Sequence, residues 1–206
     1  ILAEARTFLK WCVQSKKWLA THPLVDIQAV GKRKHGKPQL RIDEARRWLA
    51  VASQLAEDGD AGAIAAMTTL LLGLRSSEVI QREVRDLDDG GRQLWIPDSK
   101  TLAGRRRLEV PEVLQPHLRG LSEAKLPNAP LFGHHWRDWP RKQVQRICEL
   151  AKVPTVCAHS MRGLHSTLAI EAGTTAHAVA SSLGHESPAV TFRSYVAPGT
   201  AQRANA

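Results

Sequence analysis

AGAIAAMTTLLL, residues 61–72, is an almost wholly apolar stretch of small and aliphatic side chains. It is shorter than the roughly 18 residues needed to span a membrane, so it predicts a helix buried in the core of a folded domain. Gly73 follows directly and is expected to end this helix, because glycine is preferred just beyond a helix C-terminus. The fold should therefore be organised around one central helix.

Helical patterns lie on both sides of this stretch. Before it, Asp43 is a candidate N-cap for an amphipathic helix that ends at residues 58–60. After it, Ser76 or Ser77 is expected to cap a helix that runs toward Val84. Further helices are predicted at 111–121, 137–151, 160–172, 176–183 and 188–195, with Gly173 and Gly184 just beyond helix ends and Pro188 at a helix start.

The spacing of apolar residues changes from helical to alternating in the middle of the chain. QLWI at 93–96 and RLEV at 107–110 predict two half-buried strands. They are joined through residues 101–104, with Lys100 near the turn, so a β-hairpin is expected. The predicted fold class is mainly α with a small antiparallel β-sheet.

The first 40 residues differ from the rest of the chain. A helical stripe of apolar residues covers 1–20, and because the chain begins inside this stripe we expect a further segment to precede it. GKRKHGK at 31–37 is basic and contains two glycines, which favours an interdomain linker over residues 25–40. A solvated surface loop fits the same charge run equally well. Residues 41–206 are expected to form the main domain.

The composition is that of a folded protein with a polyanionic partner. Of the 206 residues, 43% are hydrophobic and 24% are charged, which excludes a disordered chain. Lys and Arg total 29 against 20 acidic residues, and the net charge of +9 favours nucleic acid or an acidic membrane surface as the partner. The sequence has no membrane-length apolar run and no secretion signal, so we expect no membrane partner and a cytoplasmic location.

Four short segments carry side chains suited to phosphate chemistry. They are GLRSSEV at 73–79 with Arg75, SKT at 99–101 with Lys100, HSMR at 159–162 with His159 and Arg162, and LGH at 183–185 with His185, which precedes Tyr195 by ten residues. Each pattern alone is weak, because short motifs recur by chance. Their order along one chain is the informative feature.

In this order the four segments resemble the active site of the tyrosine recombinases, the phage integrase family. The resemblance spans residues 40–198 and implies a catalytic domain at 41–206 that cleaves and rejoins DNA strands through a 3′-phosphotyrosyl intermediate. Residues 1–24 would be the terminal helix of the family's core-binding domain. The implied partners are double-stranded DNA and further copies of the chain, as a tetramer on DNA, with a nucleoid-associated location and no cofactor or metal.

The resemblance implies that Arg75 and Arg162 clamp the scissile phosphate. Two guanidiniums on the non-bridging oxygens would neutralise the charge that builds in the transition state. For a single arginine a surface ion pair, here between Arg75 and Glu78, is the ordinary alternative. Within the set, Glu78 is expected to orient Arg75 rather than to react.

The remaining roles concern protons and the nucleophile. Tyr195, the only tyrosine in the chain, would attack the phosphorus, and because its unperturbed pKa is about 10 it needs a base, for which His159 is the candidate. Lys100 on the hairpin would protonate the departing 5′-oxygen. His185 would bond the phosphate or position Tyr195. Outside such a set, each histidine would be interpreted as structural and Lys100 as a solvated surface lysine.

Two departures from the family pattern are present. Residues 163–165 (GLH) follow Arg162 where the family commonly has His-Thr, so the start of that helix is expected to pack differently. The spacing from LGH to Tyr195 is one residue longer than in the commonest members. Neither departure removes a catalytic group.

A metal hydrolase fits only the histidine count. The chain has nine histidines, including His134 and His135, but no His-Glu-x-x-His helix, and acidic residues do not cluster beside His159 or His185. The cysteines are too scattered for a disulfide framework or a metal knuckle and are interpreted as small buried residues: Cys12, Cys148 and Cys157.

A DNA-binding module without catalysis fits the charge and the arginine run 105–107. An intact Tyr195 argues against it. A type IB topoisomerase would use similar chemistry, and the helix at 1–20, interpreted as part of a core-binding domain, favours the recombinase.

Overall fold

The computed structural model describes residues 2–27, 37–98 and 104–185. The chain divides into two compact units, Ile1–His35 and Gly36–Ala206. The division falls within the predicted linker 25–40, of which residues 28–36 lie outside the described part.

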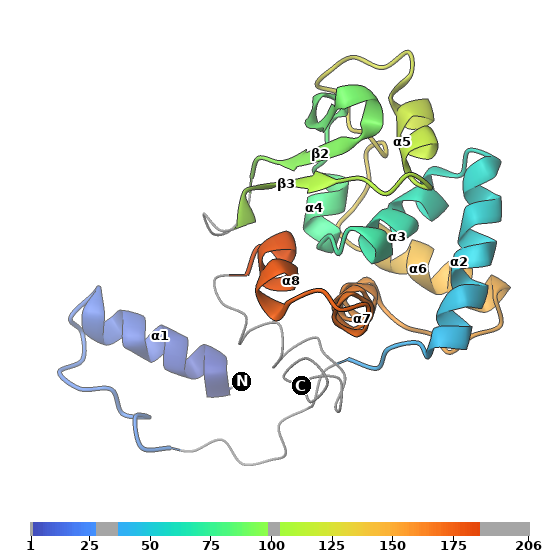
Figure 1. Ribbon diagram of the computed structural model, residues 1–206. Helices are drawn as coiled ribbons and strands as arrows, with labels where there is room; N and C mark the ends of the chain where they lie inside the picture. The colour runs from blue at the N-terminus through green and yellow to red at the C-terminus, as the bar shows by residue number, and fades with distance from the viewer. Residues whose placement is uncertain (1, 28–36, 99–103, 186–206) are drawn as a thin grey trace. The chain divides into compact units, whose positions relative to one another are not determined.

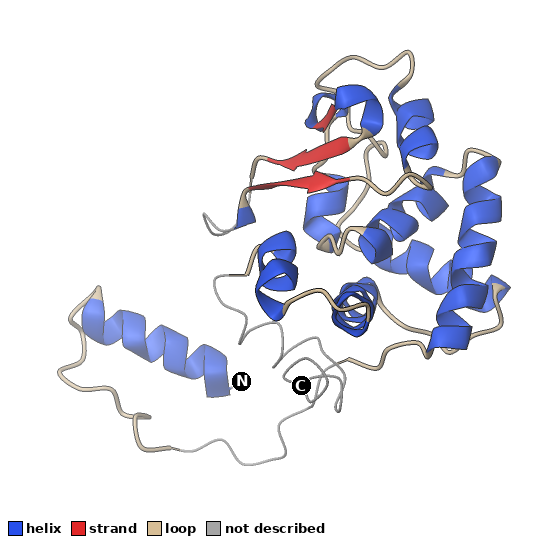
Figure 2. Ribbon diagram, in the orientation of Figure 1, coloured by secondary structure: helices blue, strands red, loops and turns tan. Residues whose placement is uncertain are grey.

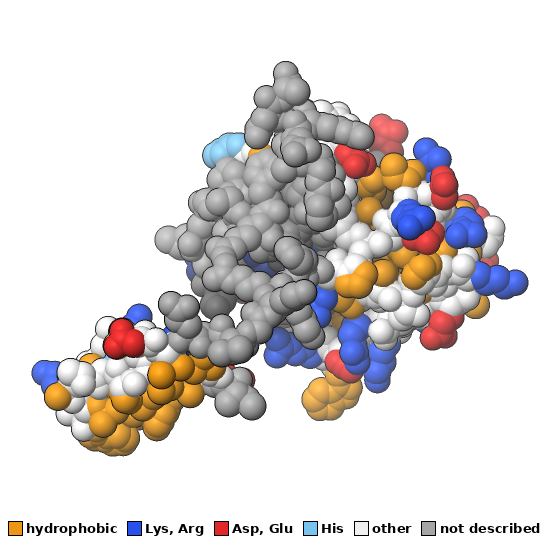
Figure 3. All heavy atoms as spheres, turned by 90° about the horizontal axis from the view of Figure 1, so that it is seen from below, with side chains coloured by type: hydrophobic (Ala, Val, Ile, Leu, Met, Phe, Trp, Pro, Cys, Tyr) orange, Lys and Arg blue, Asp and Glu red, His pale blue; other side chains and the backbone are white. Residues whose placement is uncertain are grey.

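The first unit contains helix α1 (Leu2–Gln14), which is shorter than the helix predicted over 1–20. After the helix the chain folds back, because Nδ1 of His22 accepts a hydrogen bond from the amide of Leu24 while its Nε2 lies 3.1 Å from the Arg6 carbonyl. Hydrophobic side chains gather on the face of this unit seen in Figure 3. The exposed large hydrophobic residues of the described part of this unit are Phe8, Trp11, Trp18, Leu19, Val25 and Ile27.

The second unit is built around α3 (Ala61–Leu71), the helix predicted from the apolar stretch. Every residue from Gly62 to Leu70 is buried. The helices that contact it most extensively are α2 (Ile42–Glu57), α6 (Trp139–Leu150) and α7 (Ala158–Glu171), and Figure 1 shows α3 in their midst. The prediction of a central core helix is confirmed.

The caps of two helices differ from the predicted ones. Arg41, not Asp43, is the N-cap of α2, and Arg75, not Ser76 or Ser77, is the N-cap of α4 (Ser76–Ile80). In each helix a glutamate three residues on accepts a hydrogen bond from the N-cap amide, at 2.8 Å for Glu44 and 2.9 Å for Glu78. A carboxylate at the third helical position thus replaces the side-chain oxygen expected at the cap itself.

The sheet contains the two predicted strands and a short third one (Figure 2). β2 (Gln93–Ile96) pairs antiparallel with β3 (Arg106–Glu109), so that Leu94 faces Leu108 across the pair. β1 (Leu87–Asp88) pairs antiparallel with the other edge of β2, so β2 is the central strand of the sheet. The 3₁₀ turns η1 (Val84–Asp86) and η2 (Asp89–Gly91) flank β1, and α5 (Gln115–Ser122) follows the sheet.

Two helices close the described part of this unit. α7 begins at Ala158, two residues earlier than predicted, and runs without a break through residues 163–165. Its N-cap, Cys157, is only partly buried, unlike Cys12 and Cys148. The last helix is α8 (Ala176–Leu183), with the predicted bounds.

Gly173 and Gly184 follow α7 and α8 with φ of 91° and 66°, as expected for glycines beyond helix ends. The helix predicted at 188–195, with Pro188, lies outside the described residues. Among the helices of the described residues, none is long and apolar enough to cross a membrane.

Candidate active site

Arg75 lies in the turn between α3 and α4. Gly73 makes this turn with φ of 63°, a conformation that glycine adopts without strain. The Arg75 guanidinium bonds Oε1 of Glu78 at 2.7 Å through Nη1. The Glu78 side chain is 4% exposed and that of Arg75 34% exposed. The pair therefore differs from an ordinary surface ion pair, and one side of Arg75 stays open to a ligand.

Arg162 comes from α7 and is fully buried. Its guanidinium donates to the carbonyls of Gly73 and Leu183, the latter at 2.6 Å, and Nη2 lies 3.0 Å from Nε2 of His185. Nη1 also lies 3.9 Å from Oε2 of Glu78. The structure thus brings together Arg75, Arg162 and His185, which the sequence places on three separate segments.

Arg106 is the site residue that sequence reasoning missed. The basic run 105–107 to which it belongs fits contact with DNA, but the Arg106 side chain is 7% exposed and is bound to Glu78 through Nη1–Oε1 at 3.1 Å and Nη2–Oε2 at 3.0 Å. The alternation of β3 explains this, because residues 106 and 108 point inward while 105 and 107 are exposed. This alternation is the sequence signal that points to Arg106, but the strand predicted at 107–110 begins one residue too late to include it.

The carboxyl end of α8 receives all three arginines. Its successive carbonyls at residues 182–184 each accept a hydrogen bond from a different guanidinium. The bonds are Arg106 Nε to Ser182 at 2.6 Å, Arg162 Nη2 to Leu183 at 2.6 Å and Arg75 Nη2 to Gly184 at 3.4 Å. Helix C-terminal carbonyls lack helical partners and carry partial negative charge, which makes them good acceptors for guanidiniums.

Two histidines flank these arginines in their neutral form. His159 lies in the first turn of α7 with its side chain exposed, and partial desolvation, followed by the charge of Arg162, lowers its pKa. Burial, again followed by Arg162, lowers the pKa of His185 to about 4. A neutral imidazole can accept a proton, as a general base must.

His165 ends the segment 163–165, in which the sequence departs from the family pattern. Its Nδ1 lies 3.0 Å from the carbonyl of Leu70, and burial lowers its pKa to about 4, so a neutral ring donates to this carbonyl. The ring also packs on Gly73, where an added Cβ would lie 2.8 Å from Cδ2 of His165. His165 therefore holds the end of α3 and the turn that leads to Arg75.

Lys100 and Tyr195 lie outside the described residues. Among the residues that the structure does describe, no group of three His, Cys, Asp or Glu side chains could hold a metal ion.

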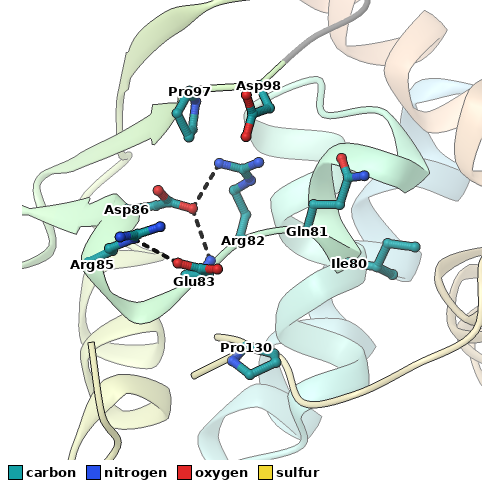
Figure 4. A pocket seen from close by; sticks show the side chains of 9 residues that line it. All are labelled: Ile80, Gln81, Arg82, Glu83, Arg85, Asp86, Pro97, Asp98 and Pro130. Atoms are coloured by element: carbon teal, nitrogen blue, oxygen red, sulfur yellow. Dashed lines mark hydrogen bonds and ion pairs between the residues drawn. The ribbon is translucent and has the colours of Figure 1, made fainter. Parts of the chain in front are cut away.

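A pocket of about 330 Å³ lies beside α4 and the end of β2 (Figure 4). Arg82 forms part of its wall, and this arginine bonds the carbonyls of Glu78 and Trp95 and the carboxylate of Asp86, each at 2.8 Å. Asp98 faces the Arg82 guanidinium in Figure 4. These bonds tie α4 to the sheet, and the pocket contains none of the predicted site residues.

Residues 38–201 match the family described as the phage integrase family. The chain belongs to this family. It is 28% identical over 208 residues to tyrosine recombinase XerC from Mycobacterium tuberculosis and from Mycobacterium bovis, an alignment that covers 92% of this chain and 68% of the relative. The chain is thus an enzyme of the tyrosine recombinase class, a site-specific recombinase that acts on DNA.

Solved structures share the fold. The XerA recombinase matches with a TM-score of 0.69 at 18% identity, over 95% of this chain and 71% of that one. The Tn1549 transposon integrase, in complex with transposon right end DNA, matches with a TM-score of 0.71 at 17% identity, over 98% and 76%. A lambda integrase dimer bound to a COC′ core site matches with a TM-score of 0.64 at 15% identity, over 92% and 56%. The predicted fold class and family are confirmed.

Proposed function

We propose that this chain cleaves one DNA strand by attack of Tyr195 on the scissile phosphorus and rejoins it from a 3′-phosphotyrosyl intermediate. The observation that carries the proposal is the convergence of Arg75 and Arg162. They come from segments 73–79 and 159–162 and meet at Glu78 and the end of α8. Paired guanidiniums are suited to phosphate oxygens; Arg75 exposes 34% of its side chain for a direct contact, whereas Arg162 is fully buried and adds its positive charge to the same site.

The clamp is oriented before DNA binds. Glu78 fixes Arg75 through its backbone and its side chain, and the carbonyls of Gly73 and Leu183 fix Arg162. Donors that are already in place need no reorganisation when negative charge develops, which is why preorganised charge lowers a reaction barrier. A phosphate oxygen of the DNA would first contact the exposed side of Arg75.

The proton transfers follow from the same assignment. The Tyr195 hydroxyl gives its proton to neutral His159 as its oxygen bonds the phosphorus, and the bond from phosphorus to the 5′-oxygen breaks. Lys100 gives a proton to the departing 5′-oxygen, since an alkoxide is a poor leaving group at neutral pH. His185, held by Arg162, positions the phosphate or Tyr195.

The domain boundaries, the partners and the location are part of the proposal. Residues 1–24 end a core-binding domain, 25–40 form a basic linker and 41–206 are the catalytic domain. Double-stranded DNA is the substrate, four copies assemble on it, and the enzyme acts in the nucleoid. The complex of Tn1549 integrase with transposon DNA supports binding to DNA, and the lambda integrase dimer on its core site supports binding as more than one copy.

Covalent trapping tests the proposal. A nicked substrate loses its short leaving fragment, so the intermediate accumulates, and denaturing gels should show a protein–DNA adduct with the wild type. Tyr195→Phe should form no adduct while binding DNA with nearly unchanged affinity, because one hydroxyl contributes little to binding. An adduct that persists in the Phe variant would show that Tyr195 is not the nucleophile.

A further inference from the structure

We infer that Arg106 is a positioning residue for strand cleavage, one that holds Glu78 in the orientation in which it directs Arg75. The inference rests on the proposed function of the arginine clamp. It assigns to Arg106 a task other than the DNA contact expected from its place in the run 105–107.

Arg106 joins three separate parts of the second unit. Nη1 and Nη2 bind the two oxygens of Glu78 in α4, Nε binds the carbonyl of Ser182 at the end of α8, and Nη1 also binds the carbonyl of Gly104 at 2.8 Å. Four acceptors in three directions match the fixed fork of a guanidinium. An ammonium group could not reach them all.

Glu78 is held between two arginines. Oε1 receives Nη1 of Arg75 at 2.7 Å and Nη1 of Arg106 at 3.1 Å, and Oε2 receives the Arg75 amide at 2.9 Å and Nη2 of Arg106 at 3.0 Å. Because each oxygen is bonded from both sides, the carboxylate cannot rotate without losing two hydrogen bonds. The direction of the Arg75 guanidinium is therefore set partly by Arg106.

The electrostatics favour the same role. Burial acts to raise the pKa of Glu78, but the hydrogen bond and charge of Arg106, together with the Arg75 amide and the charge of Arg162, outweigh it, and the pKa falls to about 2. Without Arg106 the buried carboxylate would draw more strongly on Arg75, the guanidinium that the reaction needs. A misplacement of about 1 Å in a catalytic group can cost about 10²-fold in rate.

Arg106→Lys is the informative variant, because it keeps a positive charge beside Glu78 but loses the fork. The matched control is Arg92→Lys, since Arg92 makes a comparable pair with Asp89 at 2.7 Å on the surface of the same sheet region, with its side chain 65% exposed. Arg106→Lys should cleave roughly 10- to 100-fold more slowly at saturating DNA. Its DNA affinity and the activity of Arg92→Lys should stay at the wild-type values.

Two further measurements separate positioning from a merely structural role. In an Arg75→Ala background, adding Arg106→Lys should lower the cleavage rate by less than about a further threefold. The effects of two residues that act as a unit are not additive. A methylphosphonate at the scissile position removes the charge that the clamp neutralises, and on it the loss from Arg106→Lys should also shrink to less than about threefold.

The outcomes are separable from those of the proposed function. If the wild type forms no tyrosyl adduct, the proposed function fails. If it does, the inference is overturned by wild-type cleavage in Arg106→Lys, by full additivity with Arg75→Ala, or by rescue with a bridging 5′-sulfur instead of the methylphosphonate. If Arg106→Lys does not fold, the double variant Glu78→Gln/Arg106→Gln is compared with Glu78→Gln alone. Their cleavage rates should agree within about threefold, because Arg106 is inferred to act through Glu78. A larger difference overturns the inference.

Discussion

Arg162 donates to Nε2 of His185 at 3.0 Å. A guanidinium has no acceptor, so Nε2 must be the accepting nitrogen and the His185 ring is neutral with its proton on Nδ1. The nearby charge of Arg162, added to burial, opposes protonation and accounts for the pKa of about 4. The histidine of the LGH segment is thus a neutral partner of the buried arginine, with its proton on Nδ1.

Stability should fall in mild acid. His165 and His185 have folded-state pKa values of about 4 against about 6.5 unfolded, so above pH 6.5 both are neutral in both states. Between pH 6.5 and 4 the unfolded chain takes up protons that the folded one refuses, and the free energy of unfolding decreases. For His165 alone this amounts to about 1 kcal/mol at pH 5.5.

Urea unfolding at several pH values checks this. His165→Asn keeps a donor near the Leu70 carbonyl but does not titrate, so its stability should fall less steeply in acid than that of the wild type. Parallel pH profiles for the two proteins would contradict the assignment.

Gly73→Ala should destabilise the protein more than Gly59→Ala. Both glycines have positive φ, 63° and 80°, but a Cβ on Gly73 would meet Leu183 Cδ2 at 2.6 Å, whereas nothing lies within 4 Å of one on Gly59. The backbone strain of about 1–2 kcal/mol is common to both, and the clash adds roughly 1–3 kcal/mol at Gly73. The Gly73→Ala variant should also cleave DNA more slowly, because the Gly73 carbonyl accepts a hydrogen bond from Arg162. Equal losses in thermal melts of the two variants would refute the account.

Lys100→Ala should cleave roughly 10²- to 10⁴-fold more slowly, because the 5′-oxygen would leave without a proton. A substrate with sulfur at the bridging 5′ position should restore this variant, since a thiolate leaves unprotonated. The same substrate should leave Arg75→Ala slow, because that arginine acts on the non-bridging oxygens. Rescue of a His159 variant instead would assign the acid to His159.

DNA affinity should depend steeply on salt. With about 6–10 phosphate contacts it falls roughly 10³- to 10⁵-fold between 50 and 200 mM salt. Arg105→Gln and Arg107→Gln should each lower the salt slope by about 1, because these side chains are exposed. Arg106→Gln should leave the slope unchanged, since Arg106 is bound to Glu78. Filter binding across a salt series would measure all three.

The parts of the fold that the sequence predicts well are those with strong periodic signals. α3 and the strands β2 and β3 appear within one residue of their predicted bounds, because an apolar run and an alternating pattern have few other solutions. β1 has only two residues, too few for any periodicity. The helix caps were wrong because Glu44 and Glu78 satisfy the N-cap amides from inside the helix.

The sequence indicated which residue types belong to the candidate site, but not which of them contact one another. Motif order singled out Arg75, Arg162 and His185, which the structure brings together, and their catalytic roles stay predictions. No local pattern could show that three guanidiniums share the end of α8, since that contact joins residues up to 109 positions apart. Arg106 was hidden in a basic run, and a four-residue strand gives only a short alternation from which to assign it to the interior.

The arginines around Glu78 also determine the charge to which the site is complementary. Among the described residues, three guanidiniums surround this one carboxylate, and with His159 and His185 neutral two net positive charges remain. A resting phosphodiester carries one negative charge, and in the proposed reaction a second develops on its oxygens as the Tyr195 proton passes to His159. Guanidiniums already beside these oxygens then interact more strongly with the five-coordinate state than with bound substrate, which is the condition for raising the rate rather than merely tightening binding.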